Sequence, residues 1–249
     1  MRLLTRCALV AFTVAAMVLV GPTSPGSAAV TTSDPVVASV QPRPGEVVGV
    51  AMPVVLTFTE PVANRAAVER AFTIAAPNNR TGKFEWLNAE TLQFKPDEFW
   101  PAHTTIELSV GGFKTDITTG AAVVGVADIS AHTFTVSIDG QVARTMPASM
   151  GKPSRPTPIG SFSVMSREQS VIMDSRTIGI PLNSPEGYRI TAYYAERITG
   201  SGVYVHSAPW SVDSQGNANV SHGCINLSPD NAQWYYNTVH IGDPVTVQA

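Results

Sequence analysis

The spacing of apolar residues predicts short strands along most of the first half of the chain. Between about residues 35 and 112, runs such as "PVVLTF" and "TIELSV" alternate apolar and polar positions, which is typical of strands with one buried face. Turn-forming stretches, among them "RPGE", "APNNRTG" and "KPDEFWPAH", separate these runs. Only "NRAAVERAF", residues 64–72, has a helical pattern. We therefore predict a small β-sandwich with little helix in this half.

The second half also predicts strands, with one principal helix. In "HTFTVSIDGQVARTMPAS", two alternating runs flank Asp139-Gly140, a pair typical of a tight hairpin turn. "SGVYVHSAPWS" and the closing "DPVTVQ" predict further strands. Ser228 can cap a helix whose first turn holds Pro229 and whose body is "DNAQWYYNTV", with Trp234 and one of the two following tyrosines packed inward. The fold class is thus mainly β.

About forty residues, 163–201, connect the hairpin to the later strands, and several glycines and prolines interrupt them. A connection of this length is uncommon unless it acts as a lid or a binding surface, or carries a hairpin of its own. A stretch of small residues, 111–130, separates the two halves, so we predict domains at residues 30–123 and 124–249.

The first 29 residues have the three parts of a secretory signal. Arg2 and Arg6 provide the positive segment, Ala8 to Val20 the apolar segment, and Ser27-Ala28-Ala29 the small residues of a cleavage site. An uncleaved membrane anchor is the alternative, but thirteen residues fall short of the roughly 20 that a spanning helix needs. We predict cleavage after Ala29 and export to a periplasm-like space or the cell wall, outside the cytoplasmic membrane.

The charge of the chain excludes some partner classes. The full sequence has 16 Lys plus Arg against 19 Asp plus Glu, and loss of the signal removes two arginines and no acid. No cluster of Lys and Arg is present in the sequence. Because binding to nucleic acid or to an anionic membrane depends on such clusters, neither is expected as the principal partner.

Removal of the signal also leaves a single cysteine. Of the two cysteines, Cys7 lies within the signal, so Cys224 has no partner for an internal disulfide. In an exported protein, an unpaired cysteine indicates either an intermolecular disulfide or a reactive thiol.

A thiol becomes a good nucleophile when a histidine or a positive helix end stabilises its thiolate. His222 is two residues from Cys224, and in an extended segment both side chains would share a face. His206 would come near Cys224 if its strand pairs with the cysteine segment, and the spacing does not choose between the two histidines. Ser207 could orient a histidine, while N–H groups around Gly223 could face an oxyanion.

These residues resemble a known family. "HSAPWS" followed by "SHGCINLSPDN" is similar to the signature of the L,D-transpeptidases, and "GKPSRPTPIGSF" is similar to an upstream element of the same family. The first half resembles bacterial immunoglobulin-like domains, and this two-part order is that of mycobacterial L,D-transpeptidases. The resemblance implies an immunoglobulin-like β-sandwich followed by a β-rich catalytic domain.

The resemblance also implies an activity and a set of site residues. Cys224 would attack the bond between diaminopimelate and D-alanine in a tetrapeptide stem of peptidoglycan, and a neighbouring stem amine would resolve the acyl-enzyme into a 3→3 cross-link. Carbapenem β-lactams would acylate the same thiol, and no cofactor is implied. His206 would be the general base, and Ser207 would orient it through its carbonyl. The other implied residues are His222 and Gly223 around the oxyanion and thiol, and Met173, Tyr188, Trp210 and Asn226 in contact with substrate.

Four alternatives remain beside this interpretation. A zinc ion could be bound by Cys224, His206 and His222. The thiol could instead be a buried structural residue. The protein could bind the wall without catalysis. It could also be an L,D-carboxypeptidase, with water in place of the acceptor amine.

Overall fold

The computed structural model describes residues 35–75 and 81–249, so the predicted signal, residues 1–29, lies outside the described residues. Two separate hydrophobic cores are present, one formed by residues from Val40 to Ile117 and the other by residues from Val123 to Val247. No helix in the described ranges is both long and apolar enough to cross a bilayer.

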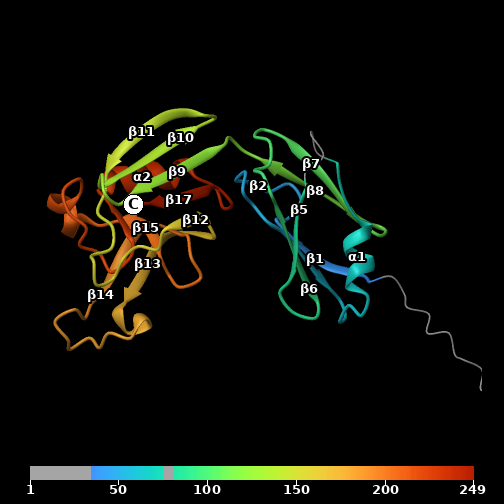
Figure 1. Cartoon of the computed structure of the whole chain (residues 1–249), viewed down its shortest axis with the longest axis horizontal. Coiled ribbons are helices and arrows are strands. Elements are labelled where there is room, and N and C mark those ends of the chain that lie inside the picture. Colours follow the sequence, from blue (N-terminus) through green and yellow to red (C-terminus); the bar gives the residue numbers. More distant parts are fainter. Residues whose placement is uncertain (1–34, 76–80) are drawn as a thin grey trace, which may run out of the picture. The chain divides into compact units, whose positions relative to one another are not determined.

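Two four-stranded sheets form the first half (Figure 1). Their strand orders are β1-β3-β6-β5 and β2-β8-β7-β4. The strands are β1 (Val37–Gln41), β2 (Val47–Val48), β3 (Val54–Phe58), β4 (Phe72–Ala75), β5 (Gly82–Trp86), β6 (Thr91–Pro96), β7 (Thr105–Val110) and β8 (Phe113–Thr119).

The alternation in the sequence accounts for this core. On β3, Val54, Leu56 and Phe58 are at most 2% exposed, as the period-two pattern predicts for one buried face. Ile106 and Leu108 on β7 are buried in the same way. The predicted sandwich is confirmed.

The predicted short helix is also present, as α1 (Arg65–Ala71). The side chain of Asn64 caps it by accepting a hydrogen bond from the N–H of Ala67 at 3.1 Å, which satisfies one of the donors left free at a helix start.

The second half contains two further sheets and the principal helix. Their strand orders are β11-β10-β9-β17-β12 and β13-β14-β15-β16. The elements are β9 (Val123–Asp128), β10 (Thr133–Ile138), β11 (Gln141–Pro147), β12 (Gly160–Ser163), β13 (Ser166–Asp174), η1 (Ser175–Ile178), β14 (Arg189–Arg197), β15 (Tyr204–Ser207), η2 (Pro209–Ser214), β16 (Ile225–Leu227), α2 (Pro229–Thr238) and β17 (Pro244–Gln248).

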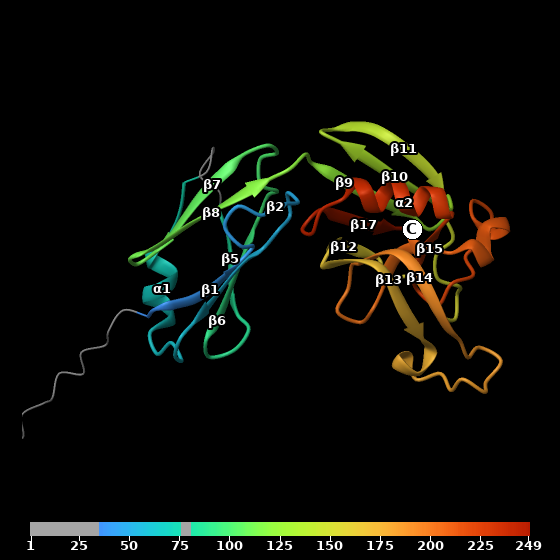
Figure 2. The same cartoon turned by 180° about the vertical axis from the view of Figure 1, so that it is seen from behind.

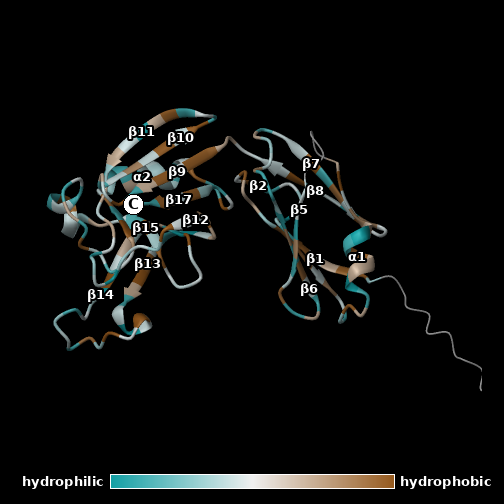
Figure 3. Cartoon of the chain, viewed as in Figure 1, coloured by the Kyte–Doolittle hydropathy of each residue, from teal (hydrophilic) through white to brown (hydrophobic). Residues whose placement is uncertain are grey.

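The predicted hairpin and closing strand are confirmed. β10 and β11 pair antiparallel around Asp139 and Gly140, and β17 pairs parallel with β9. In Figure 3, β9 is largely brown, and Val123 and Ala127 of β9 and Val245 and Val247 of β17 are buried in the core.

Helix α2 lies between the two sheets of this half, and Figure 2 shows it from behind. Ser228 caps it by accepting a hydrogen bond from the N–H of Asn231 at 3.4 Å. Tyr235, which is fully buried, packs edge-on against Phe134 of β10 with ring centroids 4.9 Å apart, while the helix also packs on β14 and β15. Of the residues that the sequence left open, Tyr235 is therefore the one packed inward.

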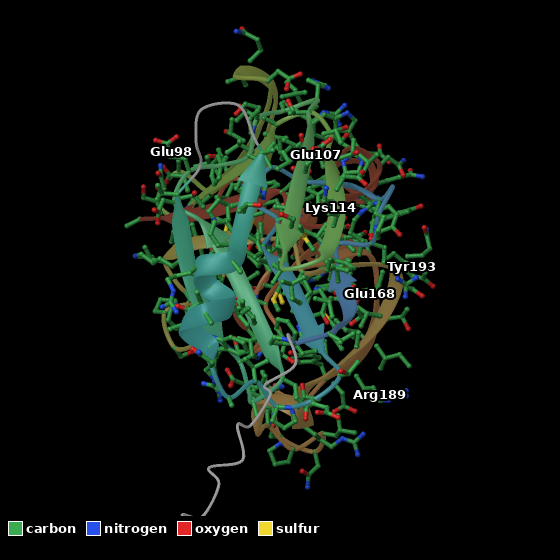
Figure 4. The ribbon with its side chains drawn as sticks, turned by 90° about the vertical axis from the view of Figure 1, so that its right-hand side faces the viewer. Glu98, Glu107, Lys114, Glu168, Arg189 and Tyr193 are labelled. Carbon is green, nitrogen blue, oxygen red and sulfur yellow. The ribbon has the colours of Figure 1, made fainter. Side chains whose placement is uncertain are left out.

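The long connection carries a hairpin of its own. Strands β13 and β14 pair antiparallel along their length, from Ser166 with Arg197 to Asp174 with Arg189. Arg189 and Tyr193 are exposed on one face of β14 and stand at the edge of the molecule in Figure 4, while Ile190 faces a cavity on the other side.

The alternation of β14 changes toward its end and brings an acid into the core. The pairing of β14 with β15 shifts register between Tyr193 and Glu196, and both Ala195 and Glu196 are fully buried. Neither carboxyl oxygen of Glu196 has a hydrogen-bond partner within the described part of the chain. Burial therefore raises the pKa of Glu196 well above its ordinary value. Burial likewise raises the pKa of Asp243, to about 7.

These acids make folding depend on pH in a defined direction. A folded state with a raised carboxyl pKa binds more protons than the unfolded chain, so stability is greatest below the ordinary pKa and falls as the pH rises toward the folded pKa. For Glu196 this loss begins near its ordinary value of 4.5 and amounts to about 1.4 kcal/mol per pH unit.

We predict that Glu196→Gln removes this loss. The variant should melt several degrees above the unmodified protein at about pH 8 and close to it at about pH 5, given roughly 2–4 °C per kcal/mol for a chain of this size. Thermal unfolding followed by circular dichroism measures the difference. Glu107→Gln, at an exposed position of β7, is the control and should differ little at either pH. An equal shift of the Glu196→Gln variant at both pH values would contradict the prediction.

Candidate active site

Parallel pairing of β15 with β16 brings the two halves of the sequence motif together. His206 is the register partner of Asn226, two residues after Cys224. A cavity of about 390 Å³ opens at this place. Seven of the nine residues expected at the site line it, namely Met173, Tyr188, His206, Trp210, His222, Cys224 and Asn226.

His206 is held as a neutral imidazole with one nitrogen free. Its side chain is almost fully buried, and its Nδ1 lies 2.9 Å from the carbonyl oxygen of Ser207. Because a carbonyl only accepts, the proton is on Nδ1 and Nε2 keeps its lone pair. Burial lowers the pKa of His206 to about 4, so the ring is unprotonated near neutral pH.

The thiol is also neutral before reaction. Burial raises the pKa of Cys224 to about 11, against the smaller opposite effect of a hydrogen bond from the backbone N–H of Tyr204. Desolvation therefore determines the protonation state of this thiol. The site therefore pairs a thiol with a neutral base.

The segment that carries Cys224 is bent, so the extended conformation in which His222 and Cys224 would share a face is not the one observed. Gly223 has φ of +118°, a conformation that glycine adopts without strain. The N–H of Gly223 donates to Ser221 Oγ at 3.1 Å, and that hydroxyl donates to the carbonyl of Cys224 at 2.7 Å. The hydroxyl of Ser221 thus holds the bend through both hydrogen bonds.

Comparisons with known proteins agree with this geometry. A family model described as the L,D-transpeptidase catalytic domain matches residues 122–247, and one described as a bacterial Ig domain matches residues 20–112. The chain is 63% identical over 213 residues to L,D-transpeptidase 1 of Mycobacterium tuberculosis (strain ATCC 25618 / H37Rv), which covers 86% of this chain and 85% of that protein. The chain belongs to the L,D-transpeptidase family.

Two solved structures of L,D-transpeptidases superpose on this chain. One is an LD transpeptidase in complex with imipenem, with a TM-score of 0.80, 63% identity, and coverage of 86% of this chain and 99% of the other. The second is L,D-transpeptidase 3 from Mycobacterium tuberculosis in complex with a faropenem-derived adduct, with a TM-score of 0.79, 56% identity, and coverage of 86% and 98%. The predicted fold class, an immunoglobulin-like domain followed by an L,D-transpeptidase catalytic domain, is confirmed.

Thr157 supports the cysteine bend of this L,D-transpeptidase, although no sequence motif assigns it a role. It is 2% exposed. Its hydroxyl accepts from the N–H of Gly151 and donates to the carbonyl of Gly223, both at 2.9 Å. Its position between two prolines is the sequence feature that could have indicated a structural role. Only the tertiary structure shows which backbone groups it joins.

Asn226 presents an acceptor in the cavity. Its Nδ2 donates to Ser211 Oγ at 3.1 Å, while its Oδ1 is buried and has no partner among the described residues. An unpaired buried oxygen at a cavity wall is available to an N–H group of a bound molecule.

Met173 and Tyr188 lie on the β13–β14 side of the cavity, and the Tyr188 ring is 5.1 Å from the His222 ring. The exposed Trp210 also lines the cavity, with its ring centroid 6.0 Å from that of His206. Their contacts with substrate stay predictions. No group of three or more His, Cys, Asp or Glu residues in the described ranges is arranged to hold a metal ion.

We predict that the resting enzyme contains a thiol rather than a thiolate. A thiolate absorbs at about 240 nm and a thiol does not. We therefore expect the unmodified enzyme and Cys224→Ala to have the same absorbance at this wavelength from about pH 6 to 8. Above about pH 10, the unmodified enzyme should absorb more strongly. A thiolate signal at neutral pH that disappears in His206→Ala would instead show an ion pair between Cys224 and His206.

We predict that Thr157→Val destabilises the catalytic domain and slows acylation of Cys224. Valine has a similar shape, but it leaves the N–H of Gly151 and the carbonyl of Gly223 without their partner. Each unsatisfied buried group lowers the stability by about 1–3 kcal/mol. The melting temperature and the rate of acylation by imipenem measure the two effects. Thr157→Ser keeps the hydroxyl and should retain both properties, and equal behaviour of the two variants would contradict the role.

Proposed function

We propose that the enzyme forms 3→3 cross-links in peptidoglycan, with Cys224 as nucleophile and His206 as general base. The observation that carries the proposal is the pair of neutral groups in one cavity, a thiol with a raised pKa and an imidazole whose Nε2 keeps its lone pair. This pair suits attack with concerted proton transfer, because charge appears only as the reaction proceeds.

In the first step, Sγ of Cys224 attacks the carbonyl carbon between the L-centre of diaminopimelate and the terminal D-alanine of a tetrapeptide stem. Nε2 of His206 takes the thiol proton. The resulting imidazolium is stabilised by the carbonyl of Ser207, to which its Nδ1–H already donates. When the tetrahedral intermediate collapses, the proton passes to the leaving nitrogen, D-alanine departs and a thioester remains.

In the second step, an amine of a neighbouring stem attacks the thioester. His206 accepts the proton of that amine and returns it to the sulfur, so the new amide forms and the thiol is restored. Water in place of the amine would give hydrolysis, and the L,D-carboxypeptidase alternative differs only in this step.

The oxyanion of each intermediate needs donors close to Cys224. We assign this function to the bend formed by His222, Gly223 and Cys224. Because the N–H of Gly223 already donates to Ser221, the N–H of Cys224 and the ring of His222 are the better candidates within that bend. The free Oδ1 of Asn226 would accept from an N–H of the stem, with Met173, Tyr188 and Trp210 around the chain of the substrate.

We also infer the setting in which the enzyme acts. The predicted signal in residues 1–29 and the substrate both place it outside the cytoplasmic membrane, with residues 30–123 and 124–249 as its two domains. A β-lactam can replace the donor because its strained carbonyl is attacked by the same thiol, and relatives in complex with imipenem and with a faropenem-derived adduct support this.

The decisive experiment is intact-mass analysis of the purified enzyme. We predict one covalent imipenem adduct per chain, at Cys224, and with a tetrapeptide stem a thioester followed by a cross-linked dimer of stems. His206→Ala should slow acylation by about 10²- to 10⁴-fold, the usual contribution of a general base. Cys224→Ala should give no adduct and no dimer.

Three results would contradict parts of this proposal. Labelling at a residue other than Cys224 would exclude the thiol mechanism. A larger loss in His222→Ala than in His206→Ala would mean that the other histidine is the base. Release of tripeptide with no dimer, in the presence of excess acceptor stem, would identify a carboxypeptidase.

A further inference from the structure

Lys152 joins two segments at the mouth of the cavity. It lies in the loop between β11 and β12, and its backbone N–H donates to the carbonyl of Ser221 at 3.0 Å. Its ammonium hydrogen-bonds the carboxylate of Glu186 and lies 3.4 Å from Nε2 of His222. Lys152 thus connects the cysteine bend to residues 179–188, the connection that leads into β14.

Partial burial and the packing of the backbone beside Glu186 restrain the ion pair between Lys152 and Glu186. The side chain of Lys152 is 24% exposed and that of Glu186 is 44% exposed. Gly187 packs so closely on the preceding turn that a Cβ there would lie 2.5 Å from the carbonyl oxygens of Pro181 and Leu182, so the backbone beside Glu186 has little freedom. The hydrogen bond from Lys152 also lowers the pKa of Glu186, which keeps the carboxylate ionised.

The chemistry of these groups decides which nitrogen of His222 carries a proton. A lysine ammonium has three donors and no acceptor, so Nε2 of His222 must accept from it. A ring that accepts at Nε2 is neutral and has its single proton on Nδ1. A second proton would place an imidazolium 3.4 Å from the ammonium, which is unfavourable for two like charges.

We propose that Lys152 is a positioning residue for acylation, which holds His222 neutral, with its proton on Nδ1, two residues from the nucleophile. The inference deepens the proposed function, because it concerns the histidine assigned there to the oxyanion and thiol environment. It gives that histidine one N–H donor and leaves His206 as the only imidazole that accepts the thiol proton.

The charges around His222 agree with this assignment. Burial lowers its pKa first, the charges of Lys152 and Arg155 lower it further, and Glu186 acts in the opposite direction. The ring of Tyr188 covers His222 from the β13–β14 side. The titratable and charged groups facing His222 are therefore Lys152, Arg155, Glu186, Tyr188 and Cys224.

The tautomer can be observed directly in the purified chain with ¹⁵N-labelled histidine. Long-range ¹H–¹⁵N correlation spectra distinguish the two neutral tautomers and the imidazolium, and the loss of one set of signals in His222→Gln identifies His222. We expect the Nδ1–H form near neutral pH. In Lys152→Met, we expect a mixture of tautomers and a ring that titrates closer to the ordinary value of about 6.5.

Arg155→Met is the matched control. It removes a nearby positive charge but not the hydrogen bond to Nε2, so the Nδ1–H tautomer should persist. An Nε2–H form in the unmodified enzyme, or an unchanged tautomer in Lys152→Met, would overturn the proposal. Lys152→Arg, which keeps a charged donor, should restore the Nδ1–H form, and failure to do so would count against a hydrogen bond as the cause.

The catalytic consequence is measured by the rate of imipenem acylation between about pH 5.5 and 8. The acylation rate of Lys152→Met should be about tenfold lower than that of the unmodified enzyme, which is equivalent to roughly 1.4 kcal/mol. Its pH–rate profile should have a new inflection at the pKa of His222, and the profile of Arg155→Met should lack it. An unchanged rate and pH profile would overturn the positioning role. If the unmodified enzyme took up no imipenem at all, the proposed function would fail, while the tautomer spectra would still test the effect of Lys152.

Discussion

The parallel pairing of β15 with β16 is the constraint on which the active site depends. It sets His206 beside Asn226 in register, so His206 and the segment that follows Cys224 belong to one sheet. Parallel neighbours cannot be joined by a tight turn, and the chain between them forms η2 and the cysteine bend. These two structures supply Trp210, Ser211 and His222 to the cavity wall.

Desolvation governs the chemistry that this arrangement allows. The same burial that lowers the pKa of His206 raises that of Cys224, so the reacting pair is neutral until a substrate arrives. On β14, the strand that pairs with β15, burial of Glu196 raises a carboxyl pKa without a visible catalytic use. The buried titratable groups of this domain are thus tuned mainly through loss of water, with nearby charges and hydrogen bonds as smaller effects.

The loops around the nucleophile are organised by polar contacts rather than by an apolar core. Thr157 joins two backbone groups across the cysteine bend, and Lys152 joins that bend to the connection before β14. Irregular backbone near a cavity must satisfy its hydrogen bonds individually, which explains why threonine, serine and lysine are used there. The geometry of the nucleophile therefore depends on residues that lie more than sixty positions earlier in the chain.

The sequence by itself determined the strands and the cap and body of α2, because these follow from local periodicity and capping, and its short motifs resemble those of the family to which the chain belongs. It did not show the bend at Gly223 or the different hydrogen-bond partners of His206 and His222. It also gave no function to Thr157 or Lys152. Those points were decided by the tertiary structure, because hydrogen-bond partners and desolvation arise from segments that are distant in sequence and meet only when the sheets pair.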